Sequence, residues 1–161
     1  MKFIPFSILL LFLAPCNSPK TIASSQSSND NSKVEIRFSK TACFGKCPVF
    51  TMTVSGAAKT ITYTGKQNVK KLGTFTKPIS NDSITILVRE FDNIHFFDLN
   101  EKNMSGIPDL PSIITSYSNN GKTKTVEEST NKPSVLGNLE KILTEIANSE
   151  GWQKTEATDT H

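Results

Sequence analysis

Apolar side chains recur at two different spacings along this chain, and that change of spacing most constrains the fold. Val34, Ile36 and Phe38 alternate with polar residues, as in a strand with one buried face. Similar alternation is found at 50–54, 60–64 and 113–117, and helical spacing at 84–91 and 136–146. A weakly patterned strand is expected at 69–75, and 122–127 is expected as the return strand of a hairpin. These patterns predict an α+β domain with the order β-ββ(β)-α-ββ-α. We expect an antiparallel sheet of about five to six strands with two helices packed on one face.

Capping and turn residues mark the boundaries of these elements. Ser80 or Asp82 can cap the first helix, and Pro133 suits the first turn of the second. Asn120-Gly121 predicts a two-residue hairpin, because both positions tolerate a positive φ.

The first residues are typical of an export signal. An apolar run from Phe3 to Ala14 follows Met1-Lys2, and it is too short to span a bilayer. We expect a lipoprotein-type signal peptide over residues 1–15, with Cys16 as the lipidated residue. Pro15 departs from the small residue usual before such a cysteine, so a plain secretory signal cut after Ala23 is the alternative. The localisation predicted is the cell envelope, lipid-anchored and facing the periplasm or the cell surface; the alternative is a secreted or soluble periplasmic protein.

Composition divides the rest of the chain. Residues 16–32 are rich in Ser and Asn, which predicts a disordered tether. Residues 33–154 form the expected single α+β domain, and residues 155–161 form a disordered tail. The formal charge of the whole chain is +3, without the concentrated basic stripe of a dedicated nucleic-acid binder.

Two cysteines lie close together between the first two predicted strands. Cys43 and Cys47 are separated by three residues, with Gly45 between them and Pro48 following. If Cys16 carries lipid, an even pair remains in an exported protein, where disulfides persist. Such a small ring would stabilise the fold by about 2 kcal/mol in the chain-entropy model.

This segment resembles domain-of-unknown-function family 6438, found largely in exported proteins and lipoproteins of Bacteroidota. The family core is T-x-C-[F/Y]-G-x-C-P-x-[F/Y], matched here by Thr41, Cys43, Phe44, Gly45, Cys47, Pro48 and Phe50. The similarity continues through 63–65, 96–99, 109–111, 120–122, Pro133 and the last helix. Met104 departs from it, where an aromatic residue is expected. The resemblance supports location and fold, and it implies no activity.

Three interpretations of the cysteine pair stay open: a structural disulfide, redox or metal chemistry, and two buried thiols. The second has a specific source, because T-x-C-x-x-x-C-P also resembles the copper site of Sco-type chaperones. Copper there is held by two thiolates and a distant histidine, and His95 is the only histidine of the predicted domain. Two features weaken it: a strand pattern, not a helix, follows Cys47, and His95 lies in an apolar run.

Other polar residues carry weaker signals. Asp109 precedes Leu110-Pro111 and is interpreted as a turn residue, with ligand binding as the alternative. Lys66, Lys70 and Lys71 are interpreted as protection of a sheet edge, or as a site for an anionic partner. Glu127 and Glu128 point to opposite faces of a strand and are interpreted as solvated charges.

Taken together, these features predict a non-catalytic binding or interaction module. We expect a membrane partner through the lipid anchor and an unknown protein or glycan partner, without nucleic acid; the oligomeric state stays open. No cofactor or metal is expected. The alternative is a thiol-redox or copper-handling protein that uses Cys43, Cys47 and His95.

Overall fold

The computed structural model describes residues 30–104, 107, 109–129 and 135–155. The predicted signal peptide, Cys16, most of the tether, Pro133 and the last residues of the tail lie outside this part of the chain. No helix among the described residues is both long enough and apolar enough to cross a membrane.

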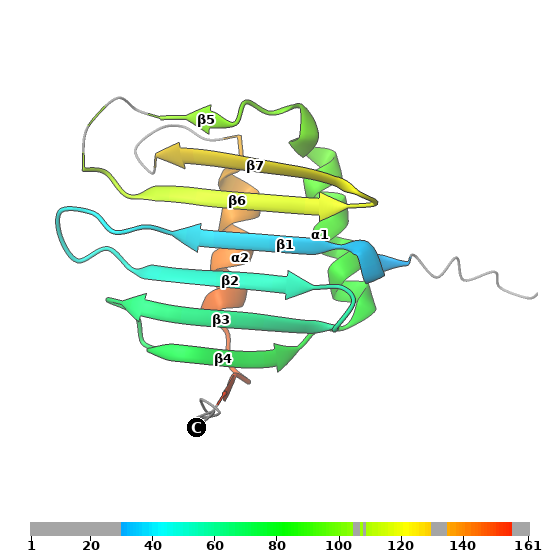
Figure 1. The fold of residues 1–161 in the computed structure, drawn as a ribbon, viewed down its shortest axis with the longest axis horizontal. Coiled ribbons are helices and arrows are strands. Elements are labelled where there is room, and N and C mark those ends of the chain that lie inside the picture. Colours follow the sequence, from blue (N-terminus) through cyan, green and yellow to red (C-terminus); the bar gives the residue numbers. More distant parts are fainter. Residues whose placement is uncertain (1–29, 105–106, 108, 130–134, 156–161) are drawn as a thin grey trace, which may run out of the picture.

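One eight-stranded sheet forms the body of the molecule, with the strand order β5-β7-β6-β1-β2-β3-β4-β8 (Figure 1). The strands are β1 (Glu35–Lys40), β2 (Val49–Ser55), β3 (Thr60–Gln67), β4 (Gly73–Pro78), β5 (Lys102–Asn103), β6 (Ser112–Asn119), β7 (Lys122–Ser129) and β8 (Gln153–Lys154). All neighbours pair antiparallel except β5 and β7. The α+β class is confirmed, whereas the expected count of five to six strands is wrong. The two strands that the pattern misses, β5 and β8, contain two residues each, too few to show a period.

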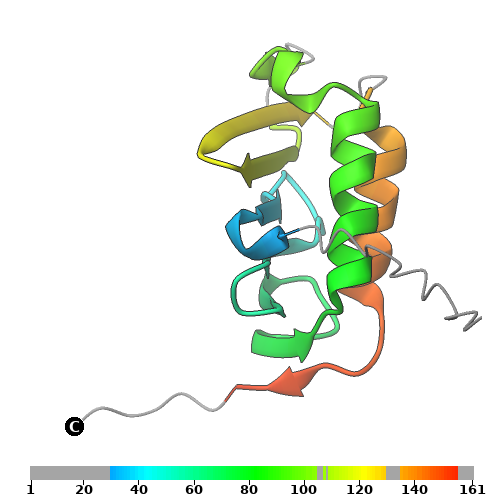
Figure 2. The same cartoon turned by 90° about the vertical axis from the view of Figure 1, so that its right-hand side faces the viewer.

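Two helices cover one face of the sheet, α1 (Asn81–Asn93) and α2 (Gly137–Asn148) (Figure 2). Ser80 is the N-cap of α1, and its hydroxyl accepts a hydrogen bond from the Ser83 amide at 3.1 Å. Ile84, Leu87 and Phe91 face the sheet and are buried, as their spacing predicts.

Aromatic rings fill much of the space between helices and sheet. Tyr117 of β6 is fully buried and stacks on Phe91 of α1, with ring centroids 4.2 Å apart. On the other side of the core, Phe50 of β2 stacks on Tyr63 of β3 at 5.2 Å. Such pairs add about 1 kcal/mol each to the hydrophobic contribution of the buried area.

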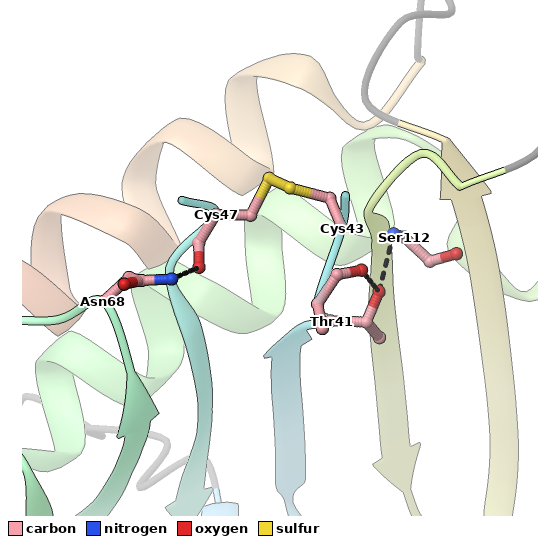
Figure 3. The surroundings of a disulfide bond; sticks show 6 residues. Thr41, Cys43, Cys47, Asn68 and Ser112 are labelled. Carbon is pink, nitrogen blue, oxygen red and sulfur yellow. Dashed lines mark hydrogen bonds between the residues drawn. A yellow bond between two sulfur atoms is a disulfide. The ribbon is translucent and has the colours of Figure 1, made fainter. Parts of the chain in front are cut away.

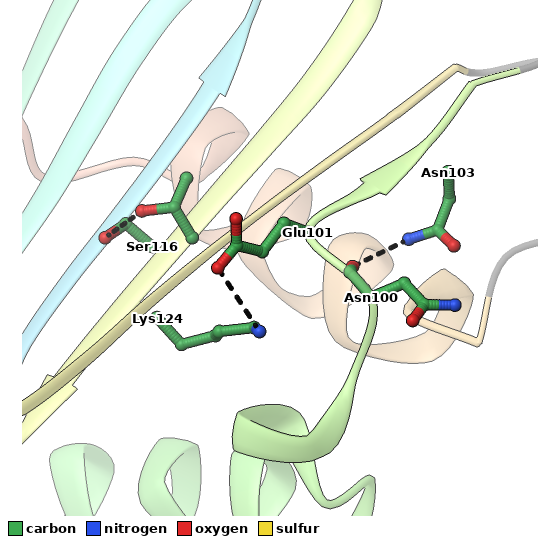
Figure 4. A network of polar contacts seen from close by, with 6 residues as sticks. Asn100, Glu101, Asn103, Ser116 and Lys124 are labelled. Carbon is green, nitrogen blue, oxygen red and sulfur yellow. Dashed lines mark hydrogen bonds and ion pairs between the residues drawn. The ribbon is translucent and has the colours of Figure 1, made fainter.

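Short elements protect both edges of the sheet. β5 lies beside β7, and the Glu127 amide donates to the Glu101 carbonyl at 2.8 Å. Lys124 also pairs with the Glu101 carboxylate at 3.6 Å (Figure 4). At the opposite edge, β8 covers β4 at Phe75 and Thr76. Two-residue strands leave little free edge for pairing with another chain.

The folded region begins before Lys33, within the predicted tether. Asp30 caps the 3-10 helix η1 (Asn31–Lys33). The side chain of Asn31 is buried and donates to α1, at 2.8 Å from the Thr85 hydroxyl. Gly56 allows this docking, because a Cβ there would lie 1.8 Å from the Asn31 carbonyl oxygen. The polar composition of residues 16–32 does not predict these contacts, because they depend on α1, which is distant in the sequence.

Candidate functional site

The cysteine loop joins β1 to β2, and its two cysteines form a disulfide. Cys43 and Cys47 have Cα atoms 5.8 Å apart, within the usual range for such bonds. The disulfide interpretation is therefore confirmed, and the hypothesis of two buried thiols is wrong. The bridge closes the loop over the ends of the two strands (Figure 3).

Hydrogen bonds hold this loop on both sides. The Thr41 amide donates to the Ser112 carbonyl at 3.0 Å, and the Ser112 amide donates to the Thr41 hydroxyl at 2.8 Å. On the other side, the Asn68 amide group donates to the Cys47 carbonyl at 3.0 Å (Figure 3). The loop is thus fixed to β6 and to the connection between β3 and β4.

Phe44 occupies the outer position of this loop. Its side chain is 96% exposed, although its amide donates to the Asp109 carbonyl at 3.4 Å. Asp109 has a φ of 62°, in the left-handed region, and the contact that it makes with the loop is through its main chain. Ile107 and Met104, which lie in the same β5–β6 connection, are 58% and 42% exposed. The end of the sheet that carries the disulfide therefore also exposes large apolar side chains.

A hollow of about 340 Å³ opens beside the disulfide loop. Three lysines line it, Lys40 from β1 and Lys70 and Lys71 from the β3–β4 connection, and its other lining residues are Pro48, Phe50, Tyr63, Asn68, Val69, Thr144 and Asn148. Gly65 of β3 lets this connection fold back, since a Cβ there would lie 1.9 Å from the Lys71 carbonyl oxygen. No acidic residue is part of the lining.

Lys71, one of the lysines of the hollow, lies against two aromatic rings. The Lys71 ammonium is 5.2 Å from the centroid of the Tyr63 ring and 5.7 Å from that of Trp152. Burial lowers the pKa of the Lys71 ammonium, and the charges of Lys77 and Lys70 lower it further. Burial also lowers the pKa of Lys40, an effect that Glu140 partly offsets.

The interpretation of these lysines as edge protection does not fit the structure. Lys70 and Lys71 lie in a connection, because β4 spans Gly73–Pro78 and not the predicted 69–75, and β8 covers its outer edge. Lys66 is exposed at the end of β3 and does not line the hollow.

Comparison with known families adds one finding. The profile described as "Domain of unknown function (DUF6438)" matches residues 34–147, which is most of the chain. The chain belongs to this family. The matched region of the DUF6438 domain contains the disulfide loop, Phe44 and all three lysines of the hollow. A search of curated proteins finds no match to the chain.

The DUF6438 domain also contains a pair of carboxyl groups that the sequence analysis missed. Glu128 is only 3% exposed, so its interpretation as a solvated charge is wrong. It faces Glu140, in the first turn of α2. Burial, and then the hydrogen bond and charge of Glu128, raise the pKa of Glu140 to about 8, while Lys40 opposes this shift. This raised pKa favours the protonated form of Glu140 at neutral pH.

The residues proposed as copper ligands are not brought together. His95 lies between α1 and the 3-10 helix η2 (Phe96–Asp98), in another part of the chain from the β1–β2 loop. The described residues contain no group of three His, Cys, Asp or Glu side chains that could hold a metal ion. The segment after Cys47 is the strand β2, where a thioredoxin-like site would need a helix.

Proposed function

We propose that this DUF6438 domain is a non-catalytic interaction module, anchored to the cell envelope, that binds a protein partner through the surface around Phe44. The observation that carries the proposal is a 96% exposed phenylalanine on a loop closed by the Cys43–Cys47 disulfide. Exposing an aromatic ring to water costs free energy that binding can recover.

A rigid aromatic side chain is well suited to binding. Aromatic residues dominate the energetics of protein interfaces, and a side chain that is already ordered loses less entropy on association. The disulfide and the bonds made by Thr41 and Asn68 fix the backbone of the loop in advance. Ile107 and Met104 provide further apolar surface in the segment that contacts Phe44.

The proposed location depends on the first residues of the sequence. Cleavage before Cys16 and lipidation of its thiol would anchor the domain to a membrane through the segment 17–29. Cys16→Ser should move the protein from the membrane fraction to the soluble fraction. An unchanged distribution, or a mature Cys16 without a diacyl mass, would favour the plain secretory alternative.

Site-specific photo-crosslinking tests the interaction surface. A photoreactive phenylalanine analogue at position 44 should give one discrete adduct on intact cells, at a mass above that of the protein itself. Leu72, which is 60% exposed on the β3–β4 connection, is the matched control position and should give none. Equal labelling from both positions, or none from position 44, would refute the proposal.

The alternative is a thiol-redox or copper-handling protein. It is supported by one observation, a disulfide at the surface whose cysteines are half-buried. The distant His95 and the strand after Cys47 favour the interaction module instead. Stoichiometric copper binding to the reduced protein, lost in Cys43→Ser, would reverse this preference.

A further inference from the structure

We propose that the hollow lined by Lys40, Lys70 and Lys71 binds an acidic sugar, with the lysines holding its carboxylate or sulfate group. This site is separate from the Phe44 surface and goes beyond the proposed function. Its volume of about 340 Å³ falls within the range of small-molecule sites.

The lining of the hollow carries an excess of positive charge. It includes Lys40, Lys70 and Lys71 and no acidic residue, and Glu140 offsets part of the charge at Lys40 alone. Among the described residues, none forms a salt bridge with Lys70 or Lys71. Lys71 is also repelled by Lys70 and Lys77. Like charges brought together in a partly desolvated site destabilise one another, and an anion would reverse that effect.

The lining also restricts the shape of the ligand. Side chains of Phe50, Tyr63 and Val69 give the hollow an apolar floor, and the Lys71 ammonium already lies over the Tyr63 ring. A bare phosphate or sulfate ion would use the lysines and leave this floor in contact with water. A sugar ring has an apolar face that packs on such a floor.

Neutral polar groups also line the hollow. Thr144 and Asn148 project from α2 into the lining and offer a hydroxyl and an amide. These groups can donate to and accept from sugar hydroxyls. Lysine binds an oxyanion as a point charge, without the planar fork of arginine, so a carboxylate and a sulfate are both suitable. An acidic sugar has a negative charge for the lysines, an apolar ring face for the floor, and hydroxyl groups for Thr144 and Asn148.

The test is a calorimetric titration of the full chain, in non-ionic detergent and at low ionic strength, with trigalacturonate as the probe. We expect saturable binding with one site, and no binding of the neutral trigalactose. Lys70→Gln/Lys71→Gln should weaken binding by about tenfold or more, the loss expected when charge-assisted hydrogen bonds are removed. Thr144→Val, which keeps every charge, should weaken it by a smaller factor.

Lys33→Gln/Lys122→Gln is the matched control, because it removes the same charge from two exposed positions outside the hollow. It should change the affinity by less than about twofold. An equal loss in both double variants would show a general effect of net charge and refute the site. Binding of inorganic phosphate as tight as that of trigalacturonate would refute the sugar. Phe44→Ala should leave the titration unchanged, so failure here is distinguishable from failure at the Phe44 surface.

Discussion

The carboxyl pair between β7 and α2 predicts that stability falls as the pH rises through the neutral range. Glu140→Gln tests this most cleanly, since glutamine has the same shape, carries no charge and can still donate to Glu128. The charged groups around Glu140 are Glu128 from β7 and Lys40 from β1. Lys40, Ile113 and Glu128 are aligned on three neighbouring strands, which places them on the same face.

The direction of this pH dependence follows from the binding of a proton by Glu140. A pKa raised from 4.5 to about 8 means that the folded state binds the Glu140 proton more tightly than the unfolded chain does. The stability from this proton is fully present below about pH 4.5 and is lost as the pH rises to about 8. The full shift would correspond to about 5 kcal/mol at most. Because the carboxyl is partly accessible to solvent and Lys40 is near, we expect about 2 kcal/mol.

Urea unfolding at pH 4, 7 and 9 measures this contribution. The variant and the wild type should have similar free energies of unfolding at pH 4, and the variant should be more stable by about 2 kcal/mol at pH 9. Glu145→Gln is the control, an exposed glutamate on the same helix, and should show no such divergence. A difference between Glu140→Gln and the wild type that does not depend on pH would refute the reasoning.

Four further variants test the stability of the fold. Cys43→Ala/Cys47→Ala should lower the free energy of unfolding by about 2 kcal/mol, measured in urea; an unchanged value would mean that the ring does not stabilise the fold. Gly56→Ala should destabilise by about 3 kcal/mol through its clash with η1. Gly137→Ala, with open space around it in α2, should stabilise by about 0.5–1 kcal/mol, and equal melting temperatures for the two glycine variants would contradict this. Asp109→Ala should cost about 1 kcal/mol because of its positive φ, and an unchanged melting temperature would favour a ligand role instead.

Features with strong local signals could be predicted from the sequence. The alternation of apolar residues predicts β1, β2, β3 and β6, the Asn120-Gly121 turn predicts β7, and the stripe at 84–91 predicts α1. The strand expected at 69–75 overlaps β4 only at Gly73–Phe75, because the residues before Gly73 have no regular period. The hairpin at Asn120-Gly121 is confirmed, with φ values of 49° and 80°. Each of these depends on residues that are close together in the chain, where propensity and turn chemistry determine the conformation.

Features that depend on distant residues could not be predicted. Asn31 belongs to the fold through contacts with α1, and no local pattern distinguishes it from its polar neighbours. Lys70 and Lys71 form a cluster in the sequence, but Lys40 lines the same hollow only through the pairing of the strands, and Thr144 and Asn148 only through the packing of α2. Glu128 did carry a signal, since it shares a strand face with buried Val126, whereas its partner Glu140 depends on the position of α2.

Intact mass of the native full chain, isolated from an oxidising compartment, tests the role of the disulfide most directly. The account predicts a mass two hydrogens below that of the reduced protein, unchanged by mild reductant and by added copper. Ready reduction, followed by a stoichiometric copper adduct that disappears in Cys43→Ser, would contradict it. The loop would then be a reactive centre and not the scaffold that presents Phe44.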